Sequence, residues 1–155
     1  MFRSVKIKSI RLTLLSLIGV LLFAAVVLVA LRGGASDTIE IGGEKVSLIA
    51  EDESDVRRFL LACGYDDPEF LFEHEITVPK NWNETYIQYN ALQKEQGFDL
   101  VPYKGKPAIG YVYFVDETLN ATVLVSDSRI IAAHICSVDG SEMKILHRKE
   151  NQTQP

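Results

Sequence analysis

The longest apolar feature of the sequence is an uncharged run of twenty residues, from Leu12 to Leu31. A helix of that length spans about 30 Å, which is the thickness of the hydrocarbon core of a bilayer. Thr13 and Ser16 are the polar side chains in the run, and each can bond a carbonyl group of its own helix. The pattern therefore predicts a transmembrane helix over residues 12–31.

A first amphipathic helix is predicted after the acidic stretch of residues 51–55. Apolar side chains then recur at intervals of three and four residues, and Gly64 follows them as a C-terminal stop. Acids at the N-terminal end also interact favourably with the helix dipole. The residues with this spacing are Val56, Phe59, Leu60 and Cys63.

A second helix is predicted to begin at Asn81, whose spacing from Glu84 is that of a capping box. Gly97 is placed to end it. The helix is predicted to continue with a spacing of three and four residues that puts its aromatic residues on one face, through Trp82, Tyr86, Tyr89 and Gln93.

Alternating polar and apolar residues, or runs rich in β-branched and aromatic residues, predict the strands. A double glycine between the first two segments and short connections between the later ones favour antiparallel hairpins. The fold class is therefore α+β, with the two helices packed on one face of an antiparallel sheet of about four to six strands. The predicted strands cover residues 39–41, 46–48, 70–78 (half buried), 108–115, 120–126 and 129–138, and residues 143–146 are expected to add another.

The chain is long enough for one external domain with a core of its own. The predicted organisation is a basic segment (1–11), a transmembrane helix (12–31), a linker (32–37), an α+β domain (38–147) and a flexible tail (148–155).

Charge is distributed unequally about the apolar run. Residues 1–32 carry five cations and no acids, whereas residues 33–155 carry 11 cations and 21 acids, a net charge of −10. The positive-inside rule then places the N-terminus in the cytoplasm and the domain outside a single-pass cell-membrane protein. A cleaved signal peptide, cut near Gly33-Gly34-Ala35, is the alternative, although its apolar region is usually only about 7–15 residues.

The acidic charge of the external part also restricts its partners. It repels phosphate backbones, which argues against a nucleic-acid partner. The attractions that remain are to cations, basic peptides or a cationic envelope polymer. The simpler interpretation is that the charge keeps an external domain soluble.

Cys63 and Cys136 are the only thiols, and outside the membrane they meet a non-reducing setting. A disulfide between them is one interpretation, and two separate buried cysteines are the other. Cys136 lies two residues from His134 on the same strand face, a pair without a visible orienting acid. A metal site built from His74, His134, Cys136 and His147 would lack the tight local pairs of structural zinc sites, so we expect no metal.

Two polar groups remain as candidates. Glu73 and Glu75 share a strand face and are interpreted as a solvated stripe. Polar residues are interspersed with aromatic residues in and after the second helix, a mixture that suits a groove for a peptide or saccharide as well as a core. The candidate ligand-binding residues are Tyr89, Asn90, Gln93, Asp99 and Tyr103.

One block of this region, residues 89–100 followed by residues 103–106, resembles the signature of a bacterial domain-of-unknown-function family, number 4830. The resemblance extends over roughly residues 45–146 and includes residues 58–60 with 63–65, residues 76–79, and residues 129–131 with 135–137. It implies a single external domain behind one N-terminal apolar segment, mostly in Gram-positive bacteria, with no assigned activity or catalytic residues. Ala132-Ala133-His134 departs from the family pattern, in which an acid follows two small residues.

These features favour a non-catalytic module of the bacterial envelope that binds a ligand, a peptide, a saccharide or another envelope protein. No convincing nucleophile, metal constellation or phosphate loop is present, and we expect no cofactor. The alternative is a small envelope hydrolase that uses His134, Cys136 and an acid distant in sequence. A third hypothesis, an accessory subunit whose membrane helix pairs with another, rests on Gly19 alone, because Phe23 stands where a second small residue would be needed.

Overall fold

The computed structural model describes residues 36–41, 43–140 and 142–146. The predicted basic segment, transmembrane helix and C-terminal tail, residues 32–35 of the linker and residue 147 lie outside the described residues. In the part that is described, no helix is long and apolar enough to cross a membrane.

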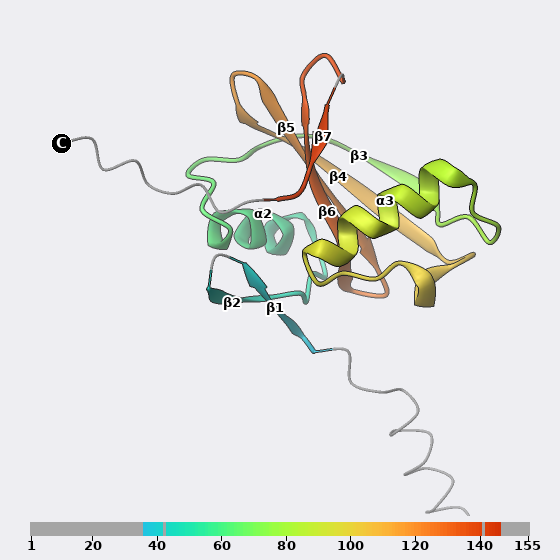
Figure 1. Ribbon diagram of the computed structural model, residues 1–155. Helices are drawn as coiled ribbons and strands as arrows, with labels where there is room; N and C mark the ends of the chain where they lie inside the picture. The colour runs from blue at the N-terminus through green and yellow to red at the C-terminus, as the bar shows by residue number, and fades with distance from the viewer. Residues whose placement is uncertain (1–35, 42, 141, 147–155) are drawn as a thin grey trace, which may run out of the picture. The chain divides into compact units, whose positions relative to one another are not determined.

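A five-stranded antiparallel sheet forms the centre of the domain (Figure 1). Its strands follow one another in chain order, and each pairs with the next. Short turns join β4 to β5 and β5 to β6, as the sequence predicts, whereas residues 78–106, which include the second helix, connect β3 to β4. A separate antiparallel hairpin, β1 (Thr38–Ile41) with β2 (Glu44–Ser47), precedes it. The sheet strands are β3 (Glu69–Thr77), β4 (Pro107–Asp116), β5 (Leu119–Ser126), β6 (Arg129–Ser137) and β7 (Met143–Lys144).

The two helices, α2 (Glu53–Ala62) and α3 (Glu84–Glu95), lie against opposite faces of this sheet. Alternate residues of a strand point to opposite faces. On β5, Val123 joins the core that contains α2, whereas Leu124 joins the core that packs against α3. The α+β class and the helices on an antiparallel sheet are as predicted, but the placement of both helices on one face was wrong. β5 and β6 are buried on both faces, so apolar residues follow one another there without a period that identifies the inner face.

Helix α2 has the boundaries that its sequence predicts. The side chain of Asp52 accepts a hydrogen bond from the backbone N–H of Asp55 at 3.2 Å and caps the N-terminus. At the other end Gly64 has φ +90°, the left-handed conformation that glycine adopts without strain. The buried residues are those of the predicted apolar stripe.

Helix α3 begins two residues later than the predicted capping box. Asn83, not Asn81, is the N-cap, and its Oδ1 accepts from the backbone N–H of Tyr86 at 3.0 Å. Trp82 therefore precedes the helix. It is half buried against the second core, with the Lys104 ammonium 4.0 Å from its ring centroid. The predicted C-terminal stop is confirmed, because Gln96 is the C-cap and Gly97 has φ +93°.

The edge of β6 is closed by three separate groups. Near its start, the backbone of residues 48–50 bonds Ser128 and Ile130. In the middle, Gln93 Oε1 accepts from the Ala133 N–H at 3.0 Å, and Gln96 Nε2 donates to the Ala133 carbonyl at 3.0 Å. At its end β7 pairs with it. Side-chain amides thus take the place of a strand where β7 does not reach.

The opposite edge of the sheet, β3, is open. Among the described residues β3 pairs with β4 only. Its side chains are exposed along its length apart from half-buried Ile76, so the prediction of a half-buried strand was wrong. Alternating residues predicted the strand correctly, but they do not reveal whether a second element covers it.

Candidate functional site

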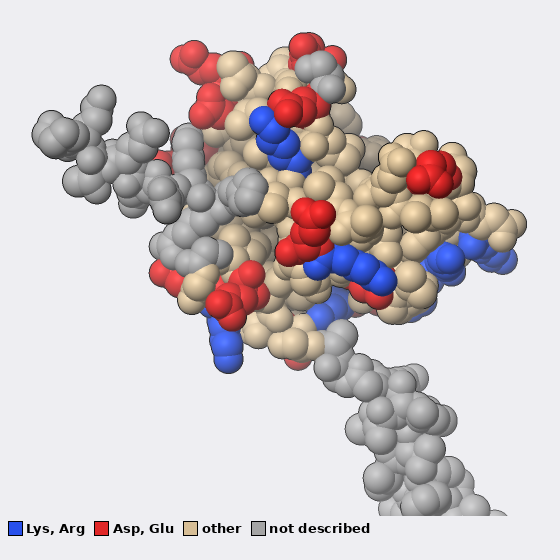
Figure 2. Space-filling model, viewed as in Figure 1, with Lys and Arg blue, Asp and Glu red and all other residues tan. Residues whose placement is uncertain are grey.

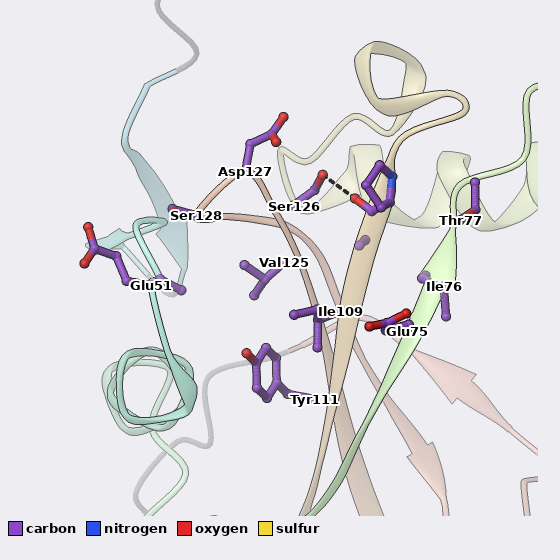
Figure 3. Close-up of a pocket in the computed structure, with 13 residues that line it drawn as sticks. Glu51, Glu75, Ile76, Thr77, Ile109, Tyr111, Val125, Ser126, Asp127 and Ser128 are labelled. Atoms are coloured by element: carbon purple, nitrogen blue, oxygen red, sulfur yellow. Dashed lines mark hydrogen bonds between the residues drawn. The ribbon is translucent and has the colours of Figure 1, made fainter.

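An open pocket of about 640 Å³ lies at one end of the sheet, on the face that carries α2 (Figure 3). Its walls come from the last residues of β3, the first residues of β4, the β5–β6 turn and the chain just before α2. Four segments that are distant in sequence therefore build one concavity.

The strand register fixes the floor of the pocket. Glu75 on β3 lies beside Ile109 on β4, which lies beside Val125 on β5. These side chains stand in one row across three strands, and Figure 3 shows Tyr111 next to them. Ile109, Val125 and Tyr111 are apolar or aromatic, so the floor is hydrophobic.

Carboxylates surround this floor. Glu51 contributes from the segment before α2, Glu75 from β3 and Asp127 from the β5–β6 turn, and all three are exposed. Asp127 forms an ion pair with Lys106 Nζ at 3.3 Å, between two exposed groups for which such pairs contribute little. Glu51 and Glu75 form no ion pair with any residue in the described part of the chain.

The turn that carries Asp127 has a defined geometry. Asp127 has φ 52° and Ser128 has φ 57°, which is the arrangement of a two-residue type I′ hairpin. Next to it, the hydroxyl of Ser126 donates to the carbonyl of Pro107 at 2.7 Å (Figure 3). Ser126 is therefore used to join β5 to the start of β4.

Tyr111 lies near several negatively charged side chains on this face. Burial raises the pKa of its hydroxyl, and the nearby charges of Glu73, Asp52 and Glu53 raise it further. Asp52 and Glu53 lie at the N-terminus of α2, and their carboxylates contribute to the negative charge near Tyr111. An ammonium or guanidinium group would be attracted to this region, and an anion would be repelled.

Two of the predicted ligand-binding residues fasten the segment after α3. Asn90 is buried; its Oδ1 accepts from the Leu100 N–H at 2.8 Å, and its Nδ2 donates to Asp99 Oδ1 at 3.3 Å. Both ends of the Asn90 side-chain amide are therefore already hydrogen-bonded, to the backbone N–H of Leu100 and to the carboxylate of Asp99. Hydrogen bonds from Val101 and Asn90 and the nearby Lys94 lower the pKa of Asp99, against a desolvation effect that would raise it.

The other predicted residues do not converge on one cavity either. Gln93 lies at the β6 edge, fully buried. Tyr103 is half buried against the second core, with Lys106 Nζ 5.2 Å from its ring centroid. Tyr89 lines a separate apolar pocket of about 540 Å³ between α3 and the sheet, whose wall also includes Leu124 and Met143.

His134 and Cys136 do not form an activated pair. The Nδ1 atom of His134 lies 3.1 Å from the hydroxyl of Tyr89, and burial lowers the pKa of the imidazole to about 4, so it is neutral near pH 7. Burial raises the pKa of the Cys136 thiol. A raised thiol pKa and a neutral imidazole are the reverse of what a nucleophilic thiolate needs.

The cysteines are both free thiols. Cys63 is buried in the core beside α2, whereas Cys136 is the neighbour of Ile135, a residue of that same core, and so points to the other face. Of the two interpretations of the sequence, the structure corresponds to two separate cysteines and not to a disulfide, although Cys136 is only partly buried. His74 and His134 are also separated, since His74 lies on β3 against Gly110 and two strands stand between it and His134. The fourth candidate metal ligand, His147, lies outside the described residues.

Sequence reasoning identified only part of the pocket. Glu75 was interpreted as part of a solvated stripe and Glu51 as part of the acidic stretch before the first helix. Ile109 and Val125 were assigned to strands, and neither they nor Asp127 were considered as site residues. The signal lies in the register, because Glu75 becomes part of a site only when Ile109 and Val125 stand beside it.

A comparison with family models, curated proteins and solved structures finds no match to this chain.

Proposed function

We propose that this chain is a single-pass membrane protein whose external domain is a non-catalytic module that binds cationic ligands in the bacterial envelope. The ligand class is a lysine or arginine side chain of a basic peptide. The uncharged run of residues 12–31, the basic N-terminal side and the resemblance to family 4830 support the location.

The observation that carries the ligand class is the pairing of an apolar floor with carboxylates at its rim. A lysine side chain has an aliphatic stem and a charged end, and it buries the stem while keeping the end in a polar setting. Ile109 and Val125 suit the stem, and Glu51 and Glu75 suit the ammonium group. The competing hydrolase hypothesis loses support from the neutral His134 and the protonated Cys136.

Glu75→Gln is expected to weaken binding of a lysine-containing tripeptide, acetyl-Ala-Lys-Ala-amide, by about two- to fivefold, the effect of one partly exposed charge pair. NMR titration of the full chain in detergent micelles measures the dissociation constant, and the perturbed resonances should include Ile109 and Val125. Glu95→Gln, which removes one charge from an exposed position on α3, is the matched control. Equal weakening by both variants, or equal binding of the peptide with acetylated lysine, would contradict the pocket.

Protease added to intact protoplasts is expected to remove a C-terminal tag from the full-length chain, because the positive-inside rule predicts that this end lies outside. A tag on the cytoplasmic side of a known membrane protein serves as the protected control. Protection of the tag on this chain would refute the topology. Full-length soluble protein in the medium would refute it as well.

A further inference from the structure

The open edge of β3 combines backbone groups, apolar side chains and acids in one exposed strand. This nine-residue strand pairs with β4 on one side only, among the described residues. Three consecutive apolar side chains on it are exposed by 41%, 44% and 53%, those of Phe70, Leu71 and Phe72. Native sheets usually protect such an edge, because its free N–H and C=O groups can pair with another strand.

The two edges of the sheet are treated differently. The edge of β6 is closed by backbone, by side-chain amides and by β7. β3 has no comparable cover from the described residues, although a register shift between Phe70 and Phe72 interrupts its pairing with β4. We infer that β3 is a docking edge at which a basic, extended peptide adds as a further antiparallel strand, the direction of every other strand pair in this sheet.

Charge selects this occupant. β3 carries Glu69, Glu73 and Glu75 and no lysine or arginine. A second copy of the chain would bring the same three acids to the interface, and like charges opposite each other destabilise strand pairs. A strand with lysine or arginine at alternate positions would instead place opposite charges beside these glutamates.

The faces of β3 define the pattern of that strand. Glu73 and Glu75 pair with Tyr111 and Ile109, so they lie on the face that carries the pocket. Phe72 pairs with Val112 and lies on the other face. A peptide that alternates basic and apolar residues would direct its cations toward the pocket and its apolar side chains toward Phe72, with backbone hydrogen bonds between them, as in other strand additions. This inference rests on the proposed function, because Glu75 belongs to both.

The test uses the full-length chain in nanodiscs of zwitterionic lipid and an octapeptide that alternates lysine with valine. In an extended strand, alternate N–H groups point to the same edge. Methylating the amide nitrogens of all lysines blocks one edge of the peptide, and methylating those of all valines blocks the other. Strand addition predicts that one methylated peptide keeps the affinity of the parent while the other loses about tenfold or more, since two or more hydrogen bonds are removed.

A charge exchange supplies the second measurement. The double variant Glu73→Lys/Glu75→Lys should no longer bind the lysine peptide. It should instead bind a peptide that alternates glutamate with valine, again through one edge only. Equal binding of both methylated lysine peptides, with the tripeptide still bound in the pocket, would overturn strand addition and leave the proposed function standing. If the unaltered chain bound neither the octapeptide nor the tripeptide, both the strand addition and the proposed function would be overturned. Cross-linking between copies through Leu71→Cys in the absence of peptide would assign the edge to a second copy instead.

Discussion

Tyr113→Ala is expected to lower the free energy of unfolding of the domain by about 3–5 kcal/mol, the usual effect of truncating a large buried aromatic side chain. Tyr113 is fully buried in the core beside α2. Its ring meets that of Phe70 edge to face, with centroids 5.7 Å apart. Its hydroxyl donates to Glu53 Oε1 at 2.6 Å and so joins β4 to the first turn of α2.

Tyr113→Phe is the matched control, because it keeps the ring and removes only the hydroxyl. We expect it to cost about 1–2 kcal/mol, the range for a hydrogen bond to a charged group that water can still reach. Urea unfolding of the detergent-solubilised chain, followed by the fluorescence of Trp82, measures both variants. If the alanine variant were no less stable than the phenylalanine variant, the ring would not be part of the core.

The stability of the domain is expected to fall between pH 6.5 and pH 4 because of His134. Burial lowers the pKa of this imidazole to about 4, whereas an unfolded histidine has a pKa of about 6.5. In that window the unfolded chain binds the proton and the folded chain does not, so stability decreases as the pH falls. At about 1.4 kcal/mol per pH unit, the loss reaches about 2 kcal/mol at pH 5.

Unfolding at pH 7 and at pH 5 measures this effect as a difference. His134→Asn should remove most of this difference. The substitution also removes the contact with Tyr89, so it can change the stability at pH 7, but the difference between the two pH values should still shrink. His74→Asn replaces an exposed histidine and serves as the control. A full pH dependence that persists in His134→Asn would show that other groups cause it.

The sequence predicted those elements whose signals are local. The stops at Gly64 and Gly97 depend on one residue with positive φ, and the β4–β6 meander depends on short connections. The face covered by each helix could not be predicted in this way. Ile130 to Ile135 are all buried, so β6 has no polar side from which an inner face could be inferred.

The candidate site was harder to predict for a related reason. Asn90 and Gln93 lie among aromatic residues, which suggested a groove, yet their amides bond the Leu100 and Ala133 backbone. An amide that replaces a missing strand has the same sequence signal as one that meets a ligand. The pocket, in contrast, depends on strand pairs such as Glu75 with Ile109, which are far apart in the sequence.

The unequal edges of the sheet also limit how the domain could assemble. A unit with two free edges can add neighbours on both sides and grow into a fibre, whereas a unit with one free edge stops after a single addition. In the described chain β6 is closed by residues 48–50, by Gln93 and Gln96, and by β7. Strand pairing at β3 would therefore give a finite complex of fixed stoichiometry, even where many copies of the domain are crowded together.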